Sequence, residues 1–385
     1  MYIKSYILYR EESFEMKEAK YKVGILTWHY YSNFGSRLQA FAMQVIIQKL
    51  GYEPILINYR NPEYGIIKSR QKIKNFIKMI LGYTLGNVSI FKKKFAFNDY
   101  MFERRYLIQT KLFQRKDEVA SVARECRKVV YGSDQIWAPN VYNDIYLGRG
   151  INIEKIAYAA SICLKSIPKS LRESYIDLLG KYSKILVREE SGKILLKNVC
   201  GLESDVVLDP TLMIERKIYE DMENPYFFSK EILNTDYCFC YFLNNNNDYK
   251  KTVEHFLRNK KIKTYGISLD SSNYEWISKI EGIGPREFLY LIHSAKYVFT
   301  DSYHGSIFSL LYHKEFYVFE RFSEDDPVNQ NERIYQLDRW FGINDRILKY
   351  PYRIKDNLNI NYEYFEKRLK EERANSLELL KKALE

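Results

Sequence analysis

The stretch that decides the fold is VFTDSYHGSIFSLL, residues 298–311, an apolar run that stops at a polar turn and resumes as an apolar helix. The pattern predicts a strand, a functional turn and a helix. Backbone N–H groups at the start of that helix would point at whatever the turn holds, and this geometry favours an anion such as a phosphate or a carboxylate. The alternative is a tight turn in which His304 only caps the helix.

The same order of strand, loop and helix occurs near the start of the chain. Residues 22–27 predict a short buried strand, and residues 28–36 a polar, aromatic loop. A buried helix and a second strand follow at residues 37–50 and 53–59. Together they make a βαβ unit, which builds parallel sheets with binding loops at the carboxyl ends of the strands. The loop lacks a GxGxxG pattern, so no dinucleotide is implied.

Further apolar segments extend this series and then repeat it. Before the middle of the chain each such segment ends in polar residues, and after a polar linker a second βα series begins. A chain of 385 residues is also too long for a single ordinary core. We therefore expect an α/β fold with two Rossmann-like domains. The predicted units are an N-terminal extension (1–20), a first domain (21–215) with a basic helical insertion (64–110), a linker (216–235), a second domain (236–350) and a C-terminal helical segment (351–385).

The charge of the chain indicates anionic partners. The net charge is +11 and the pI is near 9.0, which suits a phospholipid surface or a phosphorylated small molecule. Nucleic acid is not expected, because the sequence has no recognition-helix, zinc-finger or RNP-like pattern. Residues 64–98 contain Lys and Arg but no acidic residue, and residues 73–81 have the spacing of an amphipathic helix. That helix either lies on an anionic membrane or covers the protein's own core.

The cysteines and the hydropathy pattern predict the compartment. Five cysteines without metal-binding spacing indicate reduced thiols and no structural zinc. No segment is long and apolar enough to span a bilayer. We expect a cytoplasmic protein, in peripheral contact with the inner face of the cell membrane if the basic helix binds there.

Six ordered motifs carry a resemblance to a known family. The chain resembles the polysaccharide pyruvyl transferase family over about residues 21–350, in the branch with Gly-Ser-Asp-Gln at residues 132–135. The resemblance implies a fold like that of GT-B glycosyltransferases, in which two Rossmann-like domains face each other across a cleft and the C-terminal helix returns to the first. The motifs lie at residues 24–59, 132–137, 187–191, 208–212, 284–291 and 300–311.

The resemblance also implies an activity. Family members transfer pyruvate from phosphoenolpyruvate to two hydroxyls of a sugar, forming a ketal on a bacterial surface polysaccharide or its lipid-linked precursor. Phosphoenolpyruvate would be a co-substrate, with no cofactor and no metal. His304 takes the position of the family histidine at the C-domain turn, and Arg188 that of the arginine before an acidic pair. Better-known members carry Arg-Leu before that histidine, whereas this chain has Ser302-Tyr303. Either Arg188, Arg321 or Lys314 compensates, or the donor differs.

The implied chemistry gives each candidate residue a role. Ketal formation needs a group that donates and accepts protons near neutral pH, and His304 fits. Asp134 either orients or deprotonates the acceptor or caps a helix, and Asp301 either holds the tautomer of His304 or caps a helix. Arginine suits a trianionic donor because it binds phosphate or carboxylate with two N–H groups. The candidates are His304, Asp134 and Asp301 for catalysis; Arg188, Ser302, Gly305, Ser306 and Arg321 for donor binding; and His29, Asn33, Gly35, Ser133 and Gln135 for acceptor binding.

Two other functions remain open. The implied fold is shared with glycosyltransferases that use a nucleotide sugar. A non-catalytic sugar-binding protein that kept the fold is the third possibility. Release of phosphate from phosphoenolpyruvate in the presence of a sugar acceptor separates the three.

Overall fold

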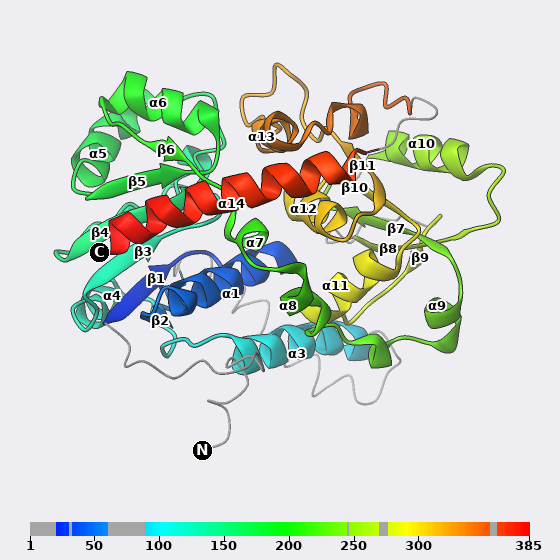
Figure 1. Ribbon diagram of the computed structural model, residues 1–385, viewed down its shortest axis with the longest axis horizontal. Helices are drawn as coiled ribbons and strands as arrows, with labels where there is room; N and C mark the ends of the chain where they lie inside the picture. Colours follow the sequence, from blue (N-terminus) through cyan, green and yellow to red (C-terminus); the bar gives the residue numbers. More distant parts are fainter. Residues whose placement is uncertain (1–20, 31–32, 61–88, 245, 269–275, 355–359) are drawn as a thin grey trace.

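Figure 1 shows a computed structural model in which two α/β domains lie side by side. The structure describes residues 21–30, 33–60, 89–244, 246–268, 276–354 and 360–385. Each domain is built on a parallel sheet of six strands. The two sheets confirm the predicted α/β class and the pair of Rossmann-like domains.

The N-terminal sheet has the strand order β2-β1-β3-β4-β5-β6, and its neighbouring strands run parallel. The chain runs from β1 to β2 on one side and continues with β3 on the other, so the topological switch point lies between β1 and β3. The strands are β1 (Lys22–Leu26), β2 (Glu53–Leu56), β3 (Lys128–Tyr131), β4 (Glu154–Ala160), β5 (Lys184–Val187) and β6 (Asp205–Val206). The helices are α1 (Phe34–Lys49), α3 (Ser89–Tyr106), α4 (Lys116–Ala123), η2 (Pro139–Val141), α5 (Lys169–Leu179), α6 (Glu190–Cys200) and α7 (Pro210–Met213).

The C-terminal sheet has the order β12-β11-β10-β7-β8-β9, again with parallel neighbours. Its switch point lies between β7 and β10. The strands are β7 (Tyr237–Phe242), β8 (Lys263–Ser268), β9 (Ser278–Lys279), β10 (Tyr297–Thr300), β11 (Glu315–Phe319) and β12 (Ile347–Leu348). The helices of this domain are α10 (Asn247–Leu257), α11 (Pro285–Ser294), α12 (Tyr303–Leu311), α13 (Glu332–Phe341) and η4 (Asn344–Arg346). The segment between the two sheets carries α8 (Arg216–Glu220), η3 (Pro225–Phe227) and α9 (Lys230–Asn234).

An apolar interface joins the domains. Phe34, the first residue of α1, is fully buried and stacks on Phe288 of α11, with ring centroids 5.0 Å apart. The ring of Tyr241 in β7 lies 6.0 Å from that of Phe34. A side chain of α3 also crosses to the second domain, where Asn98 donates to the carbonyl of Gly282 (2.6 Å). The start of α1 is therefore held between the two domains.

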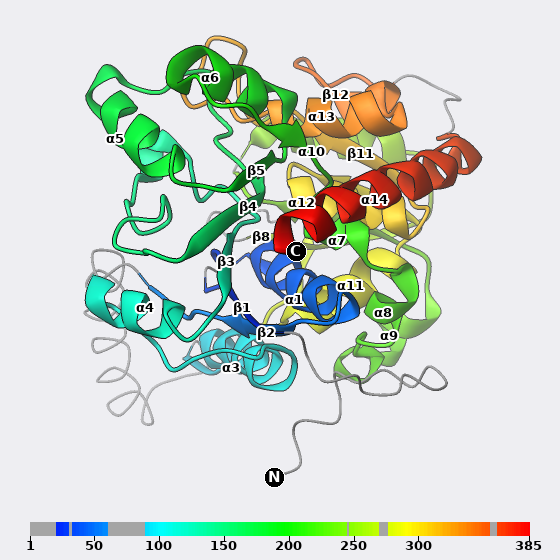
Figure 2. The ribbon, with the colours of Figure 1, turned by 60° about the vertical axis from the view of Figure 1, so that its left-hand side comes forward.

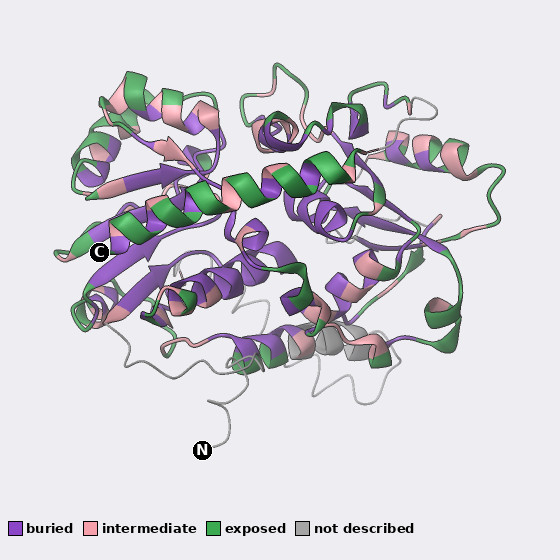
Figure 3. Cartoon of the chain, viewed as in Figure 1, coloured by how far each residue is buried: buried purple, intermediate pink, exposed green. Residues whose placement is uncertain are grey.

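The last helix, α14 (Tyr362–Leu384), spans both domains (Figures 1 and 2). It packs on α13 of the second domain and on α7 and β4 of the first. Figure 3 shows exposed residues along its outer side, and its buried residues recur at helical spacing. These buried residues are Phe365, Leu369, Ser376, Leu380 and Leu384.

Some sequence predictions fall on parts of the chain outside the described residues. The N-terminal extension (1–20) and the amphipathic helix predicted at residues 73–81 are among them. Helix α3 begins at Ser89, inside the predicted insertion at 64–110. None of the helices in the described ranges combines the length and the apolar character needed to cross a membrane.

Candidate active site

The loops at each switch point are tied together by polar side chains. In the first domain the hydroxyl of Thr27, after β1, donates to the carbonyl of Ser133, after β3 (2.7 Å). In the second domain the carboxylate of Asp301, after β10, accepts from the backbone N–H groups of Leu243 and Asn244, after β7 (2.7 and 3.0 Å). Open α/β sheets bind ligands at such switch points. The candidate site is built where these loops meet at the domain interface.

A buried ion-pair network occupies the first-domain side. Arg188 follows β5 and is fully buried, and it donates from Nε to Glu189 (3.1 Å) and from Nη1 to Asp209 (3.1 Å). Glu189 also accepts from the hydroxyl of Ser161 (2.6 Å). Burial alone would lower the pKa of Arg188, but Glu189 and Asp209 outweigh burial and raise it. The guanidinium is therefore a permanent charge at the interface.

His304 reaches this network from the second domain. It is the second residue of α12 and is 3% exposed, with Nε2 lying 3.8 Å from a carboxylate oxygen of Asp209. Its ring also touches Gly35 at the start of α1, where a Cβ would lie 2.1 Å from Nδ1 of His304. Burial lowers the pKa of His304, against the opposing influence of Asp209 and Asp134. The structure therefore places a neutral imidazole beside an ionised carboxylate, with Arg188 on the same carboxylate.

The Gly-Ser-Asp-Gln motif supports the same carboxylate. The hydroxyl of Ser133 lies 3.0 Å from Asp209, and Asp134 accepts from the hydroxyl of Ser36 (2.6 Å) and from the backbone N–H of Gln135. No helix begins at Asp134, whose φ of 72° is in the left-handed region, so the helix-cap alternative for this residue is wrong. The motif is a turn that points polar side chains at the interface. The amide of Gln135 crosses the interface and donates to Gln330 (2.7 Å).

Several buried polar atoms at this site have no hydrogen-bond partner among the described residues. They are Nη2 of Arg188, Nε2 of His304, Oε2 of Glu189, the hydroxyl of Tyr303 and Nε of Arg321. An unpaired buried donor or acceptor costs about 1–3 kcal/mol, more for a charged group. A polar, anionic ligand would supply partners for the donors in this set.

Two predicted acceptor residues have structural partners instead. His29 is fully buried, with Nδ1 3.2 Å from the carbonyl oxygen of Thr27 and Nε2 3.2 Å from the side-chain oxygen of Asn58. Burial lowers its pKa to about 4. Asn33 is the N-cap of α1 and accepts from the N–H of Gly35 (3.0 Å). Both side chains thus build the loop and the start of the helix.

At the C-domain turn the capping residue is Ser302. Its hydroxyl accepts from the N–H of Gly305 (3.3 Å), and its carbonyl accepts from the N–H and the hydroxyl of Ser306. His304 does not cap the helix, so that alternative is wrong, and the same holds for Asp301.

Asp301 bonds to the β7 loop, and its pKa is raised to about 6 by burial, although Arg321 acts in the other direction. The carboxylate nearest to His304 is Asp209, not Asp301.

Lys314 lies beyond the end of α12 that is far from the turn, so it is too distant to replace a cation there. It follows the last residue of α12, Leu311, and its backbone N–H bonds to the carbonyl of Ser309. A helix of nine residues places its two ends roughly 13 Å apart. Of the three cations named as compensating for the missing arginine, Arg188 and Arg321 lie at the site end of their elements.

The sequence reasoning did not select Asp209, Glu189, Tyr303 or Arg333. Asp209 could have been found from its place between an apolar segment and Pro210, the same position at a strand end that pointed to Arg188. In the sequence Tyr303 marks only a departure from the family's Arg-Leu pair, whereas in the structure its ring centroid lies 4.6 Å from the guanidinium carbon of Arg188. Arg333 carries no local signal, because only the tertiary fold brings α13 to this site.

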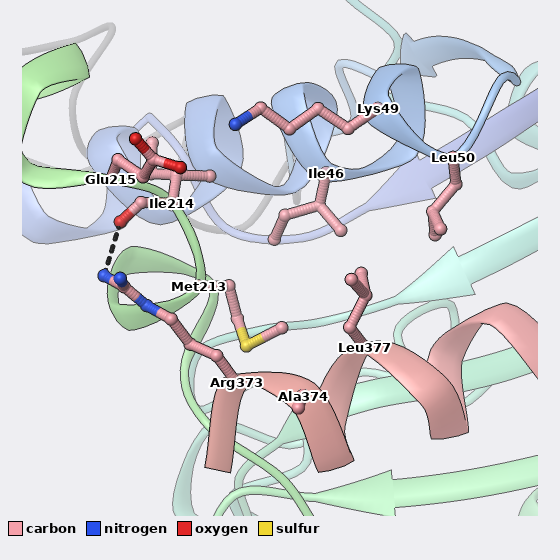
Figure 4. A pocket seen from close by; sticks show the side chains of 9 residues that line it. All are labelled: Ile46, Lys49, Leu50, Met213, Ile214, Glu215, Arg373, Ala374 and Leu377. Carbon is pink, nitrogen blue, oxygen red and sulfur yellow. Dashed lines mark hydrogen bonds between the residues drawn. The ribbon is translucent and has the colours of Figure 1, made fainter. Parts of the chain in front are cut away.

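A cavity of about 250 Å³ lies away from this cluster. Figure 4 shows it between the end of α1, the segment after α7 and α14. Arg373 at its edge donates to the carbonyls of Leu212 and Ile214. None of the predicted site residues lines this cavity, and the guanidinium of Arg373 is already bonded to the backbone. We therefore assign the candidate site to the interface cluster.

The cluster can bind an anion and move a proton. Arg188 supplies fixed positive charge, and His304 supplies an imidazole whose pKa is lowered by burial in the free protein. In the described residues no group of three or more His, Cys, Asp or Glu side chains is arranged to hold a metal ion.

Comparisons with known proteins show the family to which the chain belongs. A family model described as "Polysaccharide pyruvyl transferase" matches residues 33–323, most of the chain, and this range contains His304, Arg188 and Asp209. No curated protein sequence matches the chain.

Similar solved structures include two 2-epimerases and a glycosyltransferase. The UDP-GlcNAc 2-epimerase of Methanocaldococcus jannaschii is 12% identical, with 91% of this chain and 92% of that chain covered and a TM-score of 0.48. A putative UDP-N-acetylglucosamine 2-epimerase of Listeria monocytogenes is 9% identical, with 94% and 91% covered and a TM-score of 0.48. The glycosyltransferase SnogD of Streptomyces nogalater is 10% identical, with 94% and 99% covered and a TM-score of 0.45.

Proposed function

The chain belongs to the polysaccharide pyruvyl transferase family, and from this membership we propose that it transfers pyruvate from phosphoenolpyruvate to two hydroxyls of one sugar, forming a ketal. The observation that carries the proposal is the buried cluster at the domain interface, where Arg188 and His304 both lie against Asp209. Both also have nitrogen atoms without a partner there. An arginine and a histidine with free bonding capacity suit an anionic donor that must also be protonated.

The reaction balances with these groups. A proton is added to the methylene carbon of phosphoenolpyruvate, which becomes a methyl group, and the first sugar hydroxyl attacks the neighbouring carbon and loses its proton. The second hydroxyl then attacks the same carbon, and phosphate leaves with the bonding electrons and the remaining proton. The products are the ketal and inorganic phosphate.

His304 is the proposed proton donor. Burial lowers its pKa in the free protein, so the imidazole is neutral there at pH 7. A trianionic donor bound beside it would favour the protonated form, because an opposite charge within a few ångströms raises the pKa of a histidine. The site would then gain its acid only when the donor is bound. Asp134, next to Ser36 and Gln135, is the proposed contact for the acceptor hydroxyls.

Ligand entry requires the interface to open. The side chains of Arg188, Asp209 and His304 are 0%, 0% and 4% exposed, so no substrate reaches them while Gly35 covers His304. We propose that the described arrangement is the closed one and that the two domains separate to admit the donor and the sugar. Closure would then exclude water from the cationic intermediate.

The proposal extends to the acceptor and the location. We propose a lipid-linked sugar precursor of a bacterial surface polysaccharide as the acceptor, used at the inner face of the cell membrane. Support comes from the basic segment at residues 64–98 and the net charge of +11, which suit contact with anionic lipid. No cofactor beyond phosphoenolpyruvate as co-substrate is part of the proposal.

The test is an assay of the purified protein with phosphoenolpyruvate and a panel of lipid-linked sugars. We expect phosphate release that depends on the acceptor, together with a product heavier by the mass of a pyruvyl ketal. Release of a nucleoside diphosphate from a nucleotide sugar, with no pyruvyl product, would favour a glycosyltransferase. Sugar binding with neither reaction would favour a non-catalytic protein.

A further inference from the structure

Two arginines from different elements lie over the ring of Tyr303, and a third, Arg321, acts electrostatically on one of them. The guanidinium carbon of Arg188 lies 4.6 Å from the centroid of the Tyr303 ring, and that of Arg333, near the start of α13, lies 5.8 Å from it. Arg321, two residues after β11, lowers the pKa of Arg333 together with Arg188, after the larger effect of burial.

The carboxylates near these arginines are Glu189, Asp209 and Asp301, and of the three arginines only Arg188 is in ion-pair contact with any of them among the described residues. Arg188 is paired with Glu189 and Asp209, but within the described ranges neither Arg321 nor Arg333 forms an ion pair with a carboxylate. Arg333 donates instead to neutral groups, the backbone carbonyl and side-chain oxygen of Gln330 (both 3.2 Å). Nε of Arg321 is buried without a partner. A buried donor without a partner is costly, and a bound anion would supply a partner to Nε of Arg321 and to Nη2 of Arg188.

One of these arginines, Arg333, lies beside the turn at which this chain departs from the family motif. The sequence has Ser302-Tyr303 where the family resemblance implies Arg-Leu, and Ser302 is engaged as the N-cap of α12. The residue that does reach the site from this turn is Tyr303, and Arg333 lies against its ring. A cation from α13 therefore lies beside the turn from which the arginine is missing.

We propose that Arg333, together with Arg321 and Arg188, binds the phosphate-bearing end of the anionic donor and takes the part of the arginine absent at position 302. The inference rests on the proposed function for the identity of the donor, whereas the anion site itself rests on the arginines. The buried, unpartnered Nη2 of Arg188 and Nε of Arg321 are the donors available to the anion beside Arg333. Tyr303 acts as the surface on which two of the guanidinium groups lie.

The test uses the full-length protein and the variants Arg333→Gln and Arg333→Lys. The matched control is Arg339→Gln, which removes the same charge from the same helix, at an exposed arginine paired with Glu332. Binding of phosphoenolpyruvate, inorganic phosphate and UDP is measured by titration calorimetry, and KM and kcat by phosphate release. The thermal midpoint of each variant reports whether it folds.

We expect Arg333→Gln to bind phosphoenolpyruvate and inorganic phosphate about 10- to 100-fold more weakly, the loss of one charged hydrogen-bonded contact. KM should rise by a similar factor with a smaller change in kcat. Arg333→Lys should recover part of the affinity, because it keeps the charge but not the two-pronged geometry. Arg339→Gln should bind as the wild type does.

The outcomes separate this inference from the proposed function. Pyruvyl transfer with unchanged KM in a folded Arg333→Gln protein would overturn the inference and leave the function standing. Weakened phosphate binding in a protein that forms no ketal would uphold the anion site and overturn the function. If UDP binds more tightly than phosphoenolpyruvate and this binding is lost in Arg333→Gln, the anion site is likewise upheld and the proposed function is overturned. A wild-type protein that binds none of the three anions would overturn both.

Discussion

At the scale of single residues, Asp209 is the centre of the site. One of its oxygens meets the hydroxyl of Ser133 and the guanidinium of Arg188, and lies 3.8 Å from His304. The other accepts from the N–H and the hydroxyl of Thr211. Burial would raise the pKa of Asp209, but His304, Arg188 and Thr211 outweigh it, so the pKa is lowered and the carboxylate stays ionised. A fixed negative charge thus links both domains.

We expect Asp209→Asn to reduce the free energy of unfolding by about 3–5 kcal/mol, because it removes one partner of a buried ion pair and leaves Arg188 under-compensated. Urea denaturation followed by circular dichroism measures the change. The control is Asp177→Asn, which breaks an exposed pair with Lys181 and should leave the urea midpoint unchanged. Equal midpoints for wild type and Asp209→Asn would mean that the network does not hold the site together.

His29 gives a prediction for acid stability. Burial lowers the pKa of His29 from 6.5 to about 4. Between these two pH values the imidazole is protonated in the unfolded chain and neutral in the folded protein. The unfolded state therefore binds more protons below pH 6.5, and stability falls as the pH drops from about 6.5 to 4, by roughly 3 kcal/mol. In His29→Gln this part of the pH dependence should be missing, whereas replacing the exposed His255 by Gln should leave it in place. Parallel stability curves for wild type and His29→Gln over this range would contradict the assignment.

At the residue scale, the sequence points to side chains that follow directly from a strand end. Arg188 and His304 were located in this way, and the structure brings both to Asp209. Asp301 was given the wrong partner, because sequence does not show that the loop after β7 offers two N–H groups to it. Arg333 was missed because its contact with Tyr303 joins α13 to α12 through tertiary packing alone.

At the scale of elements, the start of α1 controls access to His304. Gly35 leaves room for the imidazole, and a Cβ there would lie 2.1 Å from Nδ1. We expect Gly35→Ala to lower the stability by about 1–3 kcal/mol through overpacking and to reduce turnover by displacing His304 or the domains. Thermal denaturation and the phosphate-release assay measure both effects.

The control for this change lies in α6. A Cβ at Gly192 would meet its nearest atoms at 3.9 Å, so Gly192→Ala should leave activity unchanged and raise stability by up to about 1 kcal/mol. Wild-type turnover and stability in Gly35→Ala would show that the contact between α1 and His304 is not part of the site.

Most elements were predictable because parallel strands buried on both faces read as short apolar runs. β1, β2 and β10 fall where the sequence placed them, and α14 is the predicted terminal helix. The short edge strands β9 and β12 were not predicted, because two residues carry no periodicity. Helix α1 begins at Phe34 rather than at Arg37, because Asn33 caps it and Phe34 is buried in the second domain.

At the scale of the whole molecule, the two domains bring together groups that neither holds alone. Arg188 and Asp209 come from the first domain, and His304, Arg321 and Arg333 from the second. The segment between the sheets and α14 both connect the domains, so they limit how the interface can open (Figures 1 and 2). A site assembled by closure is protected from water at the moment of reaction, which suits a cationic intermediate.

The central claim is that this interface protonates phosphoenolpyruvate and transfers the resulting pyruvyl group to a sugar. The most direct test is the transfer reaction run in D2O, with the mass of the ketal methyl group measured. The account predicts one deuterium in that methyl group for the wild type, and turnover lower by about 10²–10⁴ for His304→Gln. A ketal without deuterium in its methyl group, or wild-type turnover in His304→Gln, would contradict it.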